Sequence, residues 1–251
     1  MKLIKFEYKG KSDWGCVRDN LIHVVSGDIY TGPTETGDAV PLEEVKVLPP
    51  VSPSKIIGAG LNYFGLAKEH KMEIPEEPIL FFKPPSSIIG HMDHIIYPAN
   101  CNRVHYEGEL GVVIGKKVKN VSESDAFECV LGYTVANDVA AMDYLERDKQ
   151  QTTRVKGFDT FSPFGPVIAT GIEAGNLDIE TRLNGKRVQS SNTNDLIFKI
   201  DQLICAISDV MTLLPGDLIM TGSPAGVGPM KKGDTIEIEI EGIGILKNFV
   251  S

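Results

Sequence analysis

The sequence predicts a mixed β fold with some α-helix, made of a small N-terminal β-rich domain and a larger domain. Three observations support this fold class. Short apolar runs separated by Gly, Asp and Thr turns recur along the chain, apolar residues at helical spacing are confined to a few segments, and residues 47–54 contain three prolines. Strands and helices do not alternate regularly, as they would in a doubly wound sheet.

The small domain is predicted over residues 1–50. Its apolar runs at residues 3–6 and 21–25 have the length of strands, and turn sequences such as Ser-Gly-Asp at 26–28 and Thr-Gly-Pro at 31–33 follow the second run. The prolines of residues 47–54 favour an extended crossing between two units. We therefore place the boundary at residue 50 and expect the larger domain to span residues 51–251.

The larger domain is predicted to begin with a strand at residues 55–60. A short helix and then a charged loop with prolines are expected over residues 62–78, and a mobile flap is one interpretation of this stretch. A second helix is expected after Asp138, over residues 139–148. Asp201 is predicted to cap a third helix, whose apolar residues recur at helical spacing up to Leu214, before Pro215 and Gly216 end it.

The composition excludes several classes of function. The 251 residues carry a formal net charge of −9, and no cluster of basic residues offsets it, so we expect no nucleic-acid partner. No apolar stretch approaches the roughly 18 residues that a membrane span needs, and the N-terminus lacks the apolar segment of a secretory signal. We therefore expect a cytoplasmic protein without membrane contact. Its four cysteines lack zinc-site spacing and are expected to be free thiols.

Two acids stand in an otherwise apolar run, HYEGELGVVIG, at residues 105–115. Alternate side chains of a strand face the same side, so Glu107 and Glu109 point together with His105. The two carboxylates repel each other unless a cation lies between them or water screens them. The segment DTIEIEIEG at residues 234–242 shows the same alternation, so a solvent-facing edge is the alternative to a metal site.

A third acid, Asp138, ends an apolar strand-like run and precedes a predicted helix. A helix cap is the simple interpretation of this residue. If Asp138 instead joined Glu107 and Glu109, the three carboxylates would form a hard oxygen site suited to Mg²⁺, Mn²⁺ or Ca²⁺.

Four motifs in order, HYEGELGVVIGKKV, LGYTVANDVAAMD, RVKGFDTFSPFGPVI and GDLIMTGSPAGVGPMKKGDTIEIEIEGIGILKN, together resemble the fumarylacetoacetate hydrolase family. The resemblance runs from about residue 54 to the C-terminus. It implies a fumarylacetoacetate-hydrolase-like β-sandwich roll that holds Mg²⁺ or Mn²⁺ through Glu107, Glu109 and Asp138. It also implies a homodimer and a small carboxylate substrate of the 2-oxo or 1,3-dicarbonyl type, which reacts by hydrolysis, decarboxylation or keto–enol interchange through an enolate.

The resemblance also assigns roles around the metal. Lys156 of VKGFD matches the family's active-site lysine, for which a surface lysine is the alternative. Thr221 and Ser223 of the loop TGSPAGVG match positions that hold substrate oxygens, and Gln151 matches a further substrate-binding position. On the predicted flap, Glu69 matches the glutamate that assists catalysis.

The chain departs from the family pattern at four positions, one of which is Thr152, where a tryptophan is frequent. Leu66 stands where hydrolytic members carry the histidine that activates water, and Met142 and Leu145 replace polar residues that would grip a substrate carboxylate. His70 either replaces the missing histidine or is an exposed residue. We therefore expect decarboxylation or tautomerisation in preference to hydrolysis. The competing hypothesis is a family member that has lost catalysis and acts as a binding or scaffold protein.

Overall fold

The computed structural model describes residues 1–147 and 151–251. Its helices are α1 (Phe64–His70), α2 (Met142–Arg147), α3 (Thr152–Lys156) and α4 (Ile200–Val210). Its strands are β1 (Lys2–Tyr8), β2 (Lys11–Arg18), β3 (Leu21–Ser26), β4 (Thr34–Pro41), β5 (Lys46–Leu48), β6 (Ile56–Gly60), β7 (Ile79–Lys83), β8 (Ile88–Ile89), β9 (His94–Ile95), β10 (Val104–Tyr106), β11 (Gly108–Ile114), β12 (Val130–Asn137), β13 (Ala140–Ala141), β14 (Ser162–Ala169), β15 (Asp178–Leu183), β16 (Lys186–Asn192), β17 (Leu218–Met220), β18 (Gly228–Met230), β19 (Thr235–Ile240) and β20 (Gly244–Val250).

Most strands belong to two sheets. The larger sheet follows the order β4-β3-β2-β1-β14-β12-β11-β17-β6-β7, with β5 beside β1 and β8 beside β14. The second sheet follows the order β16-β15-β19-β20-β9, and its strands β15, β19 and β20 contact β11, β12 and β14 of the first. A small third sheet joins β13, β10 and β18. The sheet-rich fold with few helices confirms the predicted fold class.

The sequence pattern of each strand follows from its place in these sheets. Every residue of β11 is buried, because the strand lies between β12 and β17 and is covered on both faces. In β19 the isoleucines are buried, whereas Glu237 and Glu239 face outward and pair with Lys247 and Arg182. Glu237 and Glu239 therefore belong to a solvated face, unlike Glu109 of residues 105–115.

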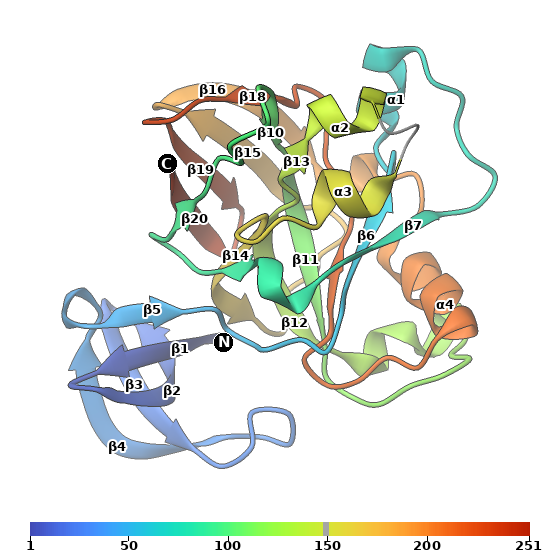
Figure 1. Cartoon of the computed structure of the whole chain (residues 1–251). Helices are drawn as coiled ribbons and strands as arrows, with labels where there is room; N and C mark the ends of the chain where they lie inside the picture. The colour runs from blue at the N-terminus through green and yellow to red at the C-terminus, as the bar shows by residue number, and fades with distance from the viewer. Residues whose placement is uncertain (148–150) are drawn as a thin grey trace.

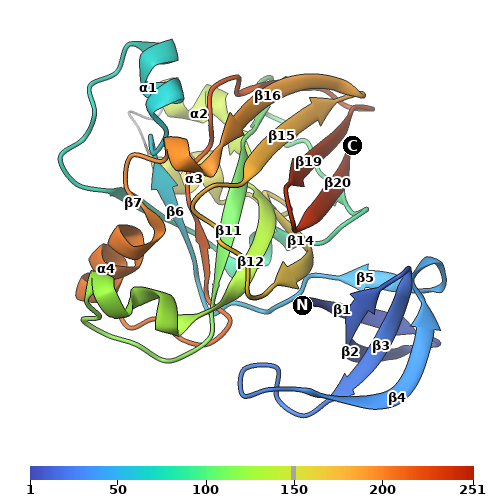
Figure 2. The same ribbon diagram turned by 180° about the vertical axis from the view of Figure 1, so that it is seen from behind.

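The N-terminal strands form a lobe set apart from the larger body (Figures 1 and 2). The lobe joins the larger sheet where Lys2 and Leu3 of β1 pair with Ala169 and Ile168 of β14. Residues 49–55 follow β5 without regular secondary structure, as their prolines predict. The division at residue 50 stays a prediction.

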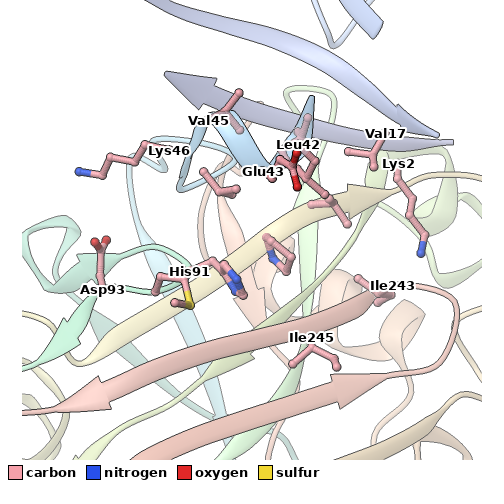
Figure 3. A pocket seen from close by; sticks show the side chains of 15 residues that line it. Lys2, Val17, Leu42, Glu43, Val45, Lys46, His91, Asp93, Ile243 and Ile245 are labelled. Carbon is pink, nitrogen blue, oxygen red and sulfur yellow. The ribbon is translucent and has the colours of Figure 1, made fainter. Parts of the chain in front are cut away.

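A cavity of about 720 Å³ lies between this lobe and strands β14 and β20. Figure 3 shows the side chains of β1, β5, β14, β20 and the loop of residues 91–93 that surround it. Most of them are apolar, with Lys2, Lys46, Glu43, His91 and Asp93 among the polar ones. The two parts of the chain are therefore not tightly packed against each other here.

Two helix predictions need correction. Lys199 is the residue before α4, so Asp201 is not its cap; Asp201 lies in the first turn, where its carboxylate accepts from the Gln202 N–H at 3.0 Å. The helix also ends at Val210, before Leu214, because Leu213 pairs with Val118 in a β-bridge.

The helix predicted over residues 139–148 begins later than expected. Ala140 and Ala141 instead form β13 and pair with β10, and the helix α2 starts at Met142. Asp148, at the predicted end, lies outside the described residues. All four cysteines are free thiols, as predicted. Among the described residues, no helix is both long enough and apolar enough to cross a bilayer.

Candidate functional site

Three carboxylates converge where β11 and β12 lie side by side. In this antiparallel pair Gly108 is opposite Asn137, which places Asp138 next to Glu107. The Asp138 N–H donates to the Glu107 carbonyl at 2.9 Å, and the Glu107 N–H donates to Asn137 Oδ1 at 2.9 Å. Glu107, Glu109 and Asp138 each offer an oxygen, and these atoms lie within 4.8 Å of one another. The structure therefore brings together the three acids that the sequence singled out.

The glycine between the two glutamates is required by a close approach of strands. A Cβ atom on Gly108 would lie 2.4 Å from Thr181 Oγ1 of β15 and 3.2 Å from Gln189 Oε1 of β16. The strand is also interrupted at Glu107, since β10 belongs to the small sheet and β11 to the large one. His105, which alternation placed beside the acids, lies on β10 and is not among the described residues that line the site.

Two lysines hold the acids in place. Lys156, the last residue of α3, places Nζ 2.5 Å from Asp138 Oδ2 and 2.8 Å from Glu107 Oε2, and donates to the Asp138 carbonyl at 3.1 Å. Lys83, the last residue of β7, places Nζ 2.5 Å from Asp138 Oδ1 and donates to the Val139 carbonyl at 3.2 Å. Lys156 was predicted from its motif.

Lys83 was missed, although the sequence contained a signal for it. It is a charged residue that ends the apolar run Ile79–Lys83 just before two prolines, and a lysine is rarely buried without a partner. Its side chain is fully buried against Asp138.

Burial and charge act differently on each member of the cluster. Burial, together with the charges of Asp138 and Glu107, raises the pKa of Glu109 well above its usual range. Burial also raises the pKa of Asp138, but Lys156 and Lys83 outweigh it and lower that pKa. Burial opposes the charge of Lys156, yet Asp138 and Glu107 raise its pKa, so it is an ammonium ion at neutral pH. Of the three acids, Glu109 is therefore the one whose ionised form its surroundings stabilise least.

The residues fit a hard divalent cation. Glu109 is 1 % exposed, and its carboxylate accepts a hydrogen bond from the Gly222 N–H at 2.7 Å. The cluster offers only carboxylate oxygens, which Mg²⁺ and Mn²⁺ prefer. A cation between the three acids would replace their mutual repulsion with attraction.

The acids form one end of a cavity of about 240 Å³. Lys156 and Ser223 lie at the same polar end, and the remaining side chains are mostly apolar. The described residues that line it are Ala59, Gly60, Leu61, Leu66, Ile79, Phe81, Glu107, Glu109, Asp138, Met142, Leu145, Thr152, Val155, Lys156 and Ser223. This cavity shares no lining residue with the one beneath the N-terminal lobe.

The loop after β17 contributes one of its two predicted residues to the cavity. Ser223 Oγ accepts from Gln189 Nε2 at 3.0 Å, and its own hydrogen has no recorded acceptor within the described part of the chain, so it is free to donate to a ligand. Thr221 is fully buried, and its hydroxyl donates to the Leu110 carbonyl at 3.0 Å. In this arrangement Thr221 fixes the loop to β11 and does not reach the cavity.

Gln151, Glu69 and His70 are not among the described residues that line the cavity. Gln151 is exposed and precedes α3. On α1, Leu66 lines the cavity, whereas Glu69 is exposed and its Oε2 accepts from the Gly226 N–H at 3.0 Å. His70 Nε2 lies 3.8 Å from Glu69 Oε2, on an exposed side chain. The glutamate therefore joins α1 to the glycine-rich loop.

Comparison with known proteins identifies the family of the chain. Residues 55–251 match the family described as fumarylacetoacetate (FAA) hydrolase, C-terminal, and residues 1–50 match an N-terminal region described as Rv2993c-like. Rat oxaloacetate tautomerase Fahd2a, a mitochondrial protein, is 43 % identical over 222 residues, which cover 84 % of this chain and 71 % of the rat protein.

Two solved structures are similar over the whole chain. The 5-carboxymethyl-2-hydroxymuconate delta-isomerase from Mycobacterium smegmatis has a TM-score of 0.93 at 40 % identity, covering 100 % of this chain and 99 % of that one. Maleylpyruvate hydrolase from Sphingobium sp. SYK-6, in complex with manganese(II) and pyruvate, has a TM-score of 0.82 at 30 % identity, covering 100 % and 98 %. On these matches, the chain belongs to the fumarylacetoacetate hydrolase family.

Proposed function

We propose that this protein is a divalent-metal-dependent enzyme that interconverts the keto and enol forms of a small 2-oxo carboxylate. The observation that carries the proposal is the placement of Lys156 beside three clustered carboxylates, two of them buried, in a cavity whose described lining includes no histidine. Two of the three relatives described above carry the names of a tautomerase and an isomerase, which supports the same class of reaction.

Glu107, Glu109 and Asp138 would hold the metal ion, for which Mg²⁺ and Mn²⁺ are the candidates. The manganese ion in the maleylpyruvate hydrolase structure supports a divalent ion in this family. When bound, such an ion polarises the 2-oxo carbonyl and stabilises the negative charge of the enolate.

Lys156 and Ser223 would bind the substrate oxygens. The pKa of Lys156 is raised, so its ammonium group stays charged and offers three N–H donors. The longest of its three contacts, 3.1 Å to the Asp138 carbonyl, is the one that a substrate oxygen would replace. Ser223 Oγ, which accepts from Gln189, would donate its hydrogen to a second oxygen.

The surroundings of Leu66 favour proton exchange over hydrolysis. Leu66 cannot take a proton from water, and Glu69 is outside the cavity, where it accepts the Gly226 N–H. Hydrolysis needs an activated water molecule, whereas tautomerisation needs only the removal and return of a proton at carbon 3, which solvent can supply. Decarboxylation of a β-oxo acid passes through the same enolate and is the second reaction that this site would support.

The test compares the two kinds of chemistry on one protein. In D₂O with Mg²⁺, the protein is expected to accelerate deuterium exchange at carbon 3 of 2-oxo acids, followed by proton NMR, and EDTA is expected to remove the effect. Cleavage of acetylpyruvate, measured by its ultraviolet absorbance, is expected to be slower. Cleavage faster than exchange would refute the proposal. Metal binding without turnover of any 2-oxo acid would instead support a binding or scaffold protein.

A further inference from the structure

We infer that the substrate is a 2-oxo monocarboxylate with an apolar side chain, and that Leu66, Met142 and Leu145 select it. This inference rests on the proposed function and specifies the part of the substrate that points away from the metal site.

The lining of the cavity combines the acids and Lys156 with a set of apolar side chains. Leu66 of α1 and Met142 and Leu145 of α2 line it together, although α1 and α2 are far apart in the sequence. Figure 1 shows these two helices and α3 at the same end of the larger body, near β6 and β7. Ile79 and Phe81 of β7 complete the apolar wall. A substrate oriented by its 2-oxo acid group at the metal site would therefore extend its side chain toward this wall.

The lining of the cavity provides a cation for one carboxylate. Lys156, which lies beside Asp138 and Glu107, is the one cationic side chain among the described lining residues. A second carboxylate, placed against Leu66, Met142 and Leu145, would find no cation among those residues. Burying an unpaired charge is strongly unfavourable, so a dicarboxylate should bind poorly.

The volume of the cavity limits the size of the substrate's side chain. Its volume of about 240 Å³ is smaller than the pockets of roughly 300–1,000 Å³ that hold drug-sized ligands. One branched aliphatic group or one aromatic ring is the size class that this space suits.

The experiment uses two 2-oxo acids that cannot enolise, so that binding is measured without reaction. Benzoylformate carries an apolar ring and one carboxylate, whereas ketomalonate carries a second carboxylate. Titration calorimetry with the Mg²⁺-loaded protein is expected to show tighter binding of benzoylformate, by about tenfold or more, since tenfold corresponds to only about 1.4 kcal/mol. Equal or tighter binding of ketomalonate would overturn the inference.

A variant gives a second, independent readout. Met142→Arg places a cation in the apolar wall and is expected to reverse the preference, whereas Met142→Leu keeps the wall apolar and is expected to preserve it. An unchanged preference in a folded Met142→Arg protein would contradict the role of the wall. Deuterium exchange on the wild-type protein distinguishes failure of this inference from failure of the proposed function. If the protein catalyses exchange but prefers dicarboxylates, only the inferred substrate preference is refuted. If it neither catalyses exchange nor binds a 2-oxo acid, the proposed function is refuted as well.

Discussion

At the scale of single residues, Asp138 has an unusual environment for a buried acid. It is 1 % exposed, and it forms ion pairs with both Lys83 and Lys156 at 2.5 Å. Glu109, a few ångströms away, receives no such cation among the described residues. The site therefore supports the charge of one acid with lysines and leaves another dependent on a metal ion.

Removal of Lys83 should destabilise the metal-free protein in particular. Lys83→Met leaves buried Asp138 with one cation fewer, and breaking a buried pair in this way costs about 3–5 kcal/mol. A divalent ion beside Asp138 offsets part of that loss, so the variant should unfold closer to the wild type in Mn²⁺ than in EDTA.

The matched control is Lys55→Met, which breaks the ion pair with Asp217 away from the acids. Its loss of stability, measured by thermal unfolding, should be the same in Mn²⁺ and EDTA. If Lys83→Met also lost the same stability in Mn²⁺ as in EDTA, the proposed position of the metal ion beside Asp138 would be contradicted.

At this scale the sequence identified some residues of the site and missed others. The two-residue repeat of a strand pointed to Glu107 and Glu109, and the end of an apolar run pointed to Asp138, but a solvent-facing edge and a helix cap stayed open as alternatives. Only the resemblance to the family joined the three acids into one metal site. The position of Lys83 at the end of an apolar run was a signal for a buried lysine, but its partner could not be assigned, since Asp138 is 55 positions away in the chain. Thr221 shows the opposite problem: its loop was identified, but the direction of its hydroxyl, toward the Leu110 carbonyl, depends on the packing of β11.

At the scale of secondary-structure elements, the position of β11 decides whether the acids converge. Gly108→Ala would place a methyl group 2.4 Å from Thr181 Oγ1, so the Thr181 side chain or one of the strands β11 and β15 must move. Overpacking of this kind costs about 1–3 kcal/mol. We expect a lower melting temperature and weaker Mn²⁺ binding, because Glu107 and Glu109 flank the displaced residue.

Gly175→Ala is the control for this substitution, since its Cβ would meet no atom within 4 Å. It should leave both the melting temperature and the metal affinity close to those of the wild type. A Gly108→Ala protein that matches this control would show that the strand contact does not position the acids.

The loop before β9 should make stability depend on pH. His91 lines the cavity beneath the N-terminal lobe (Figure 3), and its Nδ1 accepts from the Lys247 N–H at 3.2 Å. Burial and the charge of Lys247 lower the pKa of His91 from 6.5, against the opposing effect of Asp93. The unfolded chain thus binds a proton more readily, and the stability contributed by neutral His91 is lost as pH falls below about 6.5.

His91→Gln should reduce this loss. Chemical unfolding of the variant between about pH 7 and pH 5 is expected to show a flatter dependence of stability on pH than the wild type. A His91→Gln protein with the slope of the wild type would exclude His91 as a source of the effect.

Element boundaries were predicted less well than element types. The apolar spacing of residues 203–214 predicted α4, but the spacing alone could not show that Leu213 leaves the helix to pair with Val118. In the same way, Ala140 and Ala141 carry helix-forming side chains and yet pair with β10. Tertiary contacts override local preference at both positions.

At the scale of the whole molecule, a homodimer stays a prediction. Ile245 of β20 and Met92 beside it are 40 % and 49 % exposed, which is high for large apolar side chains. If this face forms the dimer contact, Ile245→Asp should lower the mass measured by analytical ultracentrifugation from dimer to monomer. Val210→Asp, at the exposed end of α4, should not change it. A monomeric wild-type protein would refute the prediction.

The central claim is that acids from two separate segments hold one hard ion. Titration calorimetry of the metal-free protein with Mn²⁺ tests it most directly. The account predicts a single binding event per chain, competition by Mg²⁺, and a loss of affinity in Glu109→Gln greater than the roughly 10- to 100-fold that follows the removal of outer-shell partners. A wild-type protein that binds no divalent ion, or a Glu109→Gln variant that binds Mn²⁺ as tightly as the wild type, would contradict the account.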